Sequence, residues 1–112
     1  MKDNKLIAEF MGFTYEKNIG WYDNDMLMSQ NVYDNQDGNC FDELLFDKSW
    51  DWLMPVVEKI ENDERYDVDI LQYGTRIREG QKDIVNNIAD ISFDKKIEHT
   101  YDAVVEFIKD RG

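Results

Sequence analysis

The residues that could do chemistry are mostly carboxylates, and they are concentrated in one stretch of the chain. From residue 18 to residue 51 there are eight acids and a single base, Lys48. Asn, Gly, Met and aromatic residues separate these acids, so we expect an irregular segment at about 18–49. The chain has 25 acids, so two carboxylates that are close in sequence do not by themselves indicate acid–base catalysis.

We interpret this acidic segment as a surface that binds a protein partner. Aromatic side chains often anchor protein interfaces, and several lie within the segment or beside it. The predicted partner-binding residues are Trp21, Tyr22, Asp23, Asp25, Asp34, Asp37, Asp42, Glu43, Asp47 and Trp50. Two plainer interpretations stay open: the carboxylates form only a solvated loop, or Trp50 and Trp52 both serve the core. If Trp50 and Trp52 lie on one helix, they point in nearly opposite directions, which predicts one buried and one outer tryptophan.

Other kinds of site have little support in the sequence. A zinc site needs three or four closely spaced ligands, whereas this chain has one cysteine, Cys40, and one histidine, His99. Neither 23–25 nor 34–39 keeps the register of an EF-hand loop, and no Gly-rich phosphate loop or nucleophile elbow occurs. The sequence therefore predicts no metal site, no cofactor and no catalytic residue, and it favours a non-enzymatic protein. An irregular carboxylate site for a divalent ion stays open.

The net charge of −12 restricts the partners that we expect. Nucleic acids and anionic membranes repel a polyanion, so the favoured partners are basic protein surfaces, and direct binding to nucleic acid or membrane is not expected. In many acidic proteins the charge serves solubility alone. The single cysteine, the absence of an apolar signal core and the absence of a long apolar run predict a cytoplasmic protein.

A chain of 112 residues is expected to form a single domain, and its helices are predicted by apolar residues at helical spacing. We expect a short helix at about 4–11, a helix at about 50–62 that Ser49 caps, and a helix at about 94–110. Pro55 is a conflict, because it either kinks the first turn of the middle helix or delays its regular part to about Met54.

Strands are expected where β-branched and apolar residues alternate with polar ones. A short strand is predicted at 13–15, and the stretches 66–72 and 75–78 are predicted to form a hairpin around Gly74. The stretch 83–91 fits a third strand, although its isoleucines also have helical spacing. The predicted fold is α+β in two layers, with an antiparallel sheet at about 67–89 packed by the helices at about 50–62 and 94–110.

Three blocks of the sequence are distinctive together: NKLIAEFMG at 4–12, SWDWLMPVVEKIE at 49–61 and KIEHTYDAVVEFIK at 96–109. In this order they resemble a family of small uncharacterised proteins found in phages and prophages of Bacteroidetes-type bacteria. The acidic segment and the last three residues depart from that family. The resemblance implies a mobile-element origin and transfers no catalytic residue.

A phage setting raises the expectation of a protein that disables host defence in the host cytoplasm. Examples are an anti-CRISPR protein, or a nucleic-acid mimic whose carboxylates occupy the basic channel of a host nucleic-acid enzyme or defence protein. Three alternatives are a small-ligand or divalent-ion binding protein, a minor hydrolase that uses carboxylates, and a structural accessory protein. The oligomeric state does not follow from the sequence.

Overall fold

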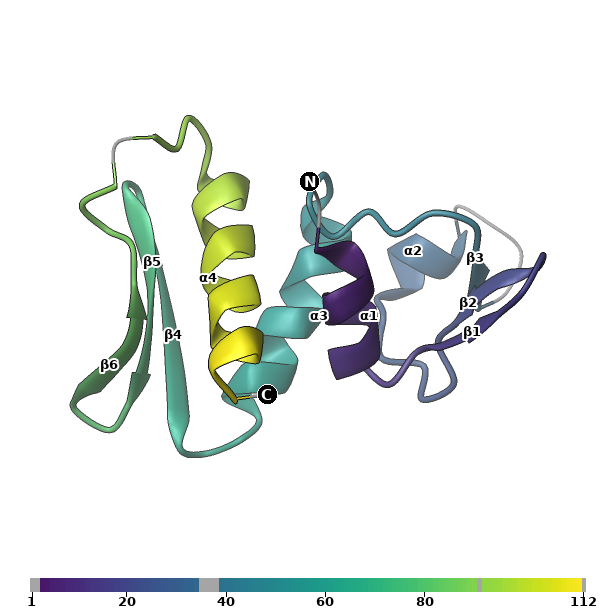
Figure 1. Ribbon diagram of the computed structural model, residues 1–112, viewed down its shortest axis with the longest axis horizontal. Helices are drawn as coiled ribbons and strands as arrows, with labels where there is room; N and C mark the ends of the chain where they lie inside the picture. The colour runs from purple at the N-terminus through teal and green to yellow at the C-terminus, as the bar shows by residue number, and fades with distance from the viewer. Residues whose placement is uncertain (1–2, 35–38, 91, 112) are drawn as a thin grey trace. The chain divides into compact units, whose positions relative to one another are not determined.

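The computed structural model of the protein describes residues 3–34, 39–90 and 92–111 (Figure 1). The fold is α+β, as predicted, with helices and two antiparallel sheets of three strands each in the described chain. The chain divides into two compact units, Met1–Val56 (unit 1) and Val57–Gly112 (unit 2), and the division falls within helix α3.

Unit 1 contains short elements around a small sheet. Their bounds are α1 (Asn4–Phe10), β1 (Thr14–Glu16), β2 (Gly20–Tyr22), α2 (Gln30–Asp34) and β3 (Cys40–Phe41). Strand β2 is central, and its Trp21 pairs with Tyr15 of β1 and with Phe41 of β3. The predicted helix at 4–11 is confirmed, and Gly12 after it has a φ of 80°, the left-handed conformation that glycine favours.

The segment at about 18–49 is more regular than its composition indicates, because β2, α2 and β3 all lie within it. Aromatic side chains of unit 1 pack against one another in a cluster that includes Phe41 of β3. The ring of Phe41 lies 6.0 Å from that of Phe13 and 4.6 Å from that of Trp52, and Phe46 lies 5.1 Å from Trp52. Such buried ring contacts favour the short strands, since local propensity is a weak influence compared with tertiary packing.

Helix α3 (Trp50–Glu61) runs continuously through Pro55, so a start delayed to Met54 is wrong. The N–H groups of Trp52 and Leu53 both donate to the carbonyl of Ser49, at 3.1 and 3.0 Å, and they close the first turn ahead of the proline. Trp52 is 6% exposed and Trp50 is 37% exposed. The prediction of one buried and one outer tryptophan is therefore confirmed.

Unit 2 is built on an antiparallel sheet in the order β4-β5-β6. The bounds of its elements are β4 (Tyr66–Leu71), β5 (Gly74–Glu79), β6 (Lys82–Asn86) and α4 (Lys96–Arg111). The predicted hairpin, third strand and last helix are confirmed, although the third strand ends at Asn86 and Ile91 lies outside the described residues. Helix α4 packs against the sheet (Figure 1). The placement of α3 against the same sheet stays a prediction.

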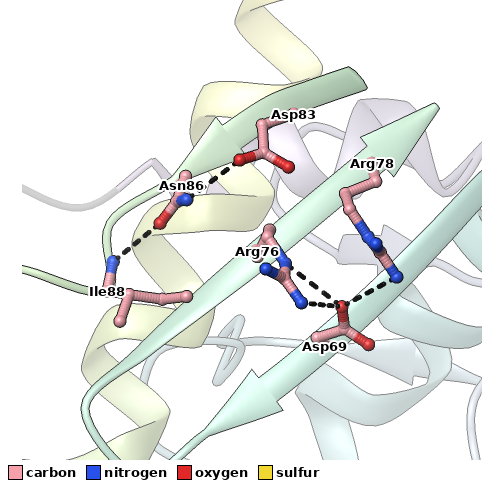
Figure 2. A network of polar contacts seen from close by, with 6 residues as sticks. All are labelled: Asp69, Arg76, Arg78, Asp83, Asn86 and Ile88. Carbon is pink, nitrogen blue, oxygen red and sulfur yellow. Dashed lines mark hydrogen bonds and ion pairs between the residues drawn. The ribbon is translucent and has the colours of Figure 1, made fainter. Parts of the chain in front are cut away.

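The two faces of this sheet differ in character. Thr75, Ile77 and Val85 are buried on the face toward α4. Polar side chains occupy the other face, which Figure 2 shows. There the carboxylate of Asp69 binds the guanidinium groups of Arg76 and Arg78, at 3.0 and 3.4 Å. Alternation along each strand thus separates a buried face from a face on which charges are paired.

Candidate functional site

Asp23 lies in the interior of unit 1, although the sequence places it in the predicted acidic surface. Its side chain is fully buried. One carboxylate oxygen accepts a hydrogen bond from the N–H of Leu27 at 3.0 Å, and the other accepts from the N–H of Met28 at 3.0 Å and from the hydroxyl of Tyr33. A buried carboxylate needs such donors, so Asp23 organises the loop between β2 and α2 and is not available to a partner.

Two neighbours extend this arrangement. The backbone of Asp23 exchanges hydrogen bonds with Asn39, at 3.0 Å from its N–H to the carbonyl of Asn39 and at 2.9 Å from the side-chain amide of Asn39 to its carbonyl. Desolvation raises the pKa of Tyr33, and the hydrogen bond to Asp23 and the charge of Asp23 raise it further. Tyr33 therefore stays a neutral donor toward Asp23 at ordinary pH.

The other predicted site residues do not form one patch of a single kind. Trp21, Tyr22 and Asp47 are half-buried, and Asp47 accepts a hydrogen bond from the side-chain amide of Asn4 at 2.9 Å. The side chains at the surface are Asp25, Asp34, Asp42, Glu43 and Trp50. Asp37 lies outside the described residues. The exposed ring of Tyr15, which sequence reasoning missed, packs 5.2 Å from Trp21.

A cavity of about 300 Å³ in unit 1 brings some of these residues together. Its polar wall includes the exposed acids Asp42, Glu43 and Asp51. Its apolar wall is formed by Val32, Leu45 and the buried Trp52. Carboxylates beside an aromatic ring attract cations, because the charge and the ring face both favour a positive group. The arrangement suits a lysine or arginine side chain whose apolar stem lies along the inner wall.

The sequence prediction included only two of the cavity's acids, Asp42 and Glu43. Asp51 was not among the predicted partner-binding residues, and its position in the first turn of a helix explains a carboxylate without any partner. The spacing of residues within α3 nevertheless indicated where Asp51 would lie. Trp50 points outward and Trp52 inward, so the acid between them stands at the border between the buried and the exposed face of the helix.

A metal site and a membrane-spanning helix are both absent from the described part of the chain. Among residues 3–34, 39–90 and 92–111, no group of three or more His, Cys, Asp or Glu side chains is arranged to hold a metal ion. Within the same ranges, no helix is both long enough and apolar enough to cross a membrane.

Comparison with known proteins does not assign a family. No protein-family model, no curated protein and no solved structure matches the chain. The resemblance of the blocks at 4–12, 49–61 and 96–109 to phage and prophage proteins therefore stays a prediction.

Proposed function

We propose that this protein acts by binding a basic protein surface, and that the cavity of unit 1 receives a lysine or arginine side chain of that partner. The observation that carries the proposal is the placement of Asp42, Glu43 and Asp51 on the rim of a cavity whose apolar wall includes Trp52. Three carboxylates favour a cation at the rim, and Trp52 and Leu45 favour the methylene groups of its stem.

The charge balance of unit 1 supports the same proposal. Eleven acids stand against four bases in Met1–Val56, and the acids of the cavity rim are exposed to solvent. An excess of surface charge of one sign steers a partner of the opposite sign and speeds its encounter. Exposed Trp50 lies on the same helical turn as Asp51 and adds an aromatic contact of the kind that dominates interface energies.

In a phage setting, the partner is a host nucleic-acid enzyme or a defence protein with a basic channel. The carboxylates then take the place of nucleic-acid phosphates, and the protein is an inhibitor of the anti-defence type. An inhibitor of this kind needs no cofactor or catalytic group, because occupation of the channel is sufficient. Its binding weakens as salt rises, because ions screen the attraction between exposed charges.

The test compares three forms of the protein as baits in affinity capture from a lysate of the host bacterium. The first is the natural sequence, and the second carries D42N, E43Q and D51N, which remove the charge from the cavity rim and keep the side-chain shapes. The third is a matched control with E9Q, E16Q and E61Q, three exposed acids outside the cavity with the same total charge change. Asp23 is left unchanged because it is buried.

We expect the natural protein and the matched control to recover the same basic protein. We expect the cavity variant to recover at least about tenfold less of this protein, which corresponds to the loss of one or two charge-assisted contacts. The captured protein is then titrated with DNA, which should compete with this chain for the same surface. Equal recovery by all three baits would contradict the proposal.

A further inference from the structure

Unit 2 has a second cavity, of about 720 Å³, at the end of the sheet where the β4–β5 turn meets the start of α4. Its volume falls in the range of small-molecule sites. Tyr73, Ile88 and Phe93 supply apolar walls, and the ring of Tyr73 is 70% exposed. Gly74 permits this geometry, because a Cβ there would lie 2.2 Å from the Cα of Ile88.

His99 forms the inner wall of this cavity. Of the lining residues in the described chain, only His99 is buried, with 2% of its surface exposed. Its Nδ1 lies 2.8 Å from the hydroxyl of Thr75, and that hydroxyl lies 3.0 Å from the hydroxyl of Thr100. Its Nε2 is buried and forms no hydrogen bond of good geometry with the described residues, although the backbone of Gln72 lies near enough to influence the ring. A buried polar atom without a partner is costly, which points to a group supplied from outside the chain.

The ring is held in its neutral form. Desolvation lowers the pKa of His99, the positive charge of Lys96 lowers it further, and the backbone of Gln72 partly offsets both effects. When Nδ1 accepts a hydrogen bond from the Thr75 hydroxyl, the neutral ring carries its proton on Nε2. The buried Nε2 then carries the only N–H donor of the ring.

Positive charge stands at the mouth of the cavity. Lys95 and Lys96 are exposed, line the cavity and form no ion pair within the described chain. They lie at the N-terminus of the 16-residue helix α4, where backbone N–H groups also favour an anion. Two acids line the cavity as well. The carboxylate of Asp90 accepts hydrogen bonds from the N–H and hydroxyl of Ser92, and Asp94 is exposed.

From these observations we infer that the cavity of unit 2 binds a small aromatic phosphate, of the class to which nucleoside monophosphates belong. The flat ring lies against Tyr73 and Phe93 and accepts a hydrogen bond from Nε2 of His99. The phosphate lies between Lys95 and Lys96 at the start of α4. This site is independent of the acidic cavity in unit 1, because it uses no residue of that unit and takes a ligand of the opposite charge.

The test follows binding by NMR on the full chain labelled with ¹⁵N, because the two ring nitrogens of His99 report both contact and tautomer. The probes are AMP and UMP, with phenyl phosphate, inorganic phosphate and adenosine as partial ligands. We expect AMP and UMP to shift the Nε2 resonance of His99 and the amides of Tyr73 and Lys96. Each partial ligand should bind about tenfold more weakly, since it lacks one set of contacts.

Two variants examine the contacts separately. The K95Q/K96Q variant should weaken AMP binding about tenfold, whereas the K17Q/K82Q control, with the same charge change at exposed positions outside the cavity, should not. H99N should also weaken binding, because the Asn amide can replace Nδ1 toward Thr75 but not Nε2. If H99N does not fold, K95Q/K96Q decides the question.

Three results would overturn the inference. The first is that no probe shifts the resonances of His99. The second is that inorganic phosphate binds as tightly as AMP, since the apolar walls would then be unused. The third is that K95Q/K96Q and K17Q/K82Q weaken binding equally, since attraction by net charge would then suffice.

Discussion

The strands of unit 1 have two or three residues, whereas those of unit 2 have five or six. The balance of acids and bases also differs between the two units. Unit 1 has eleven acids and four bases, and unit 2 has fourteen acids and nine bases, some of which are paired across its sheet. The long strands of unit 2 balance their charges locally, whereas the acids of unit 1 have few bases near them in sequence. Unit 1 therefore has the charge that a basic partner could use.

Asp23 in unit 1 and His99 in unit 2 are both buried polar side chains, and their hydrogen-bonding groups are satisfied differently. Asp23 in unit 1 accepts hydrogen bonds from two backbone N–H groups and a tyrosine hydroxyl. His99 in unit 2 contacts Thr75 through one ring nitrogen and forms no hydrogen bond of good geometry through the other with the described residues. A fully satisfied buried charge serves the fold, whereas a half-satisfied buried ring leaves a contact for a ligand.

The largest loss of stability that we expect comes from substitution of Asp23 in unit 1. Asp23→Ala removes one acceptor from the N–H groups of Leu27 and Met28 and from the Tyr33 hydroxyl, so it should lower the free energy of unfolding by about 3–5 kcal/mol. Urea denaturation followed by tryptophan fluorescence measures this, because Trp21, Trp50 and Trp52 all belong to unit 1.

Asp25→Ala is the matched control, since Asp25 is exposed two residues away and should change the same free energy by less than about 0.5 kcal/mol. Equal losses of unfolding free energy from the two substitutions would contradict the distinction between a structural acid and the surface acids of unit 1.

A smaller effect is expected from Thr75 in unit 2. Thr75→Val keeps the side-chain shape but removes the hydroxyl that contacts Nδ1 of His99 and the hydroxyl of Thr100, so it should cost about 1–3 kcal/mol. Amide hydrogen exchange in β5 and α4 measures the loss within unit 2. Thr14→Val, at an exposed threonine of β1, should leave stability almost unchanged. No loss of protection with Thr75→Val would show that the buried polar contacts of unit 2 are dispensable.

The smallest effect concerns the charge pairing on the open face of the sheet in unit 2. Asp69→Asn leaves Arg76 and Arg78 side by side without their shared carboxylate, and it should cost about 0.2–1 kcal/mol at low salt. The cost should shrink in 1 M NaCl, because added ions screen the pair. Asp67→Asn, on the same strand at an exposed position, serves as the control in the same hydrogen-exchange experiment. A cost that does not depend on salt would show that the pairing is not electrostatic.

The main elements of unit 2 followed from the sequence. Alternation in 66–72 and 75–78 predicted β4 and β5, and apolar spacing in 94–110 predicted α4. Such patterns are recognisable because the buried side chains of a regular element recur at a fixed interval along the sequence. The third strand was ambiguous, since the isoleucines of 83–91 fit either period. The register of Val85 opposite Ile77 places it in the sheet.

The candidate sites followed from the sequence only in part. The acids Asp42 and Glu43 were predicted as partner-binding residues, and both line the cavity of unit 1. Asp51 and Trp52 were not predicted there, because their positions in a helix have a sufficient local explanation. His99 was not among the predicted site residues, and no pattern in the sequence indicated that its ring would be buried beside Thr75.

The sequence by itself determined the α+β class, the hairpin and the last helix of unit 2, the acidic balance and the inward side of α3, since each depends on composition or on a repeat along the chain. Only the tertiary structure decided that Asp23 is buried while Asp25 is exposed. The two acids have the same chemistry and nearly the same place in the sequence. What separates them is the set of donors that folding brings to Asp23 from Leu27, Met28 and Tyr33. Burial of a charge depends on such three-dimensional partners, which have no period along the chain.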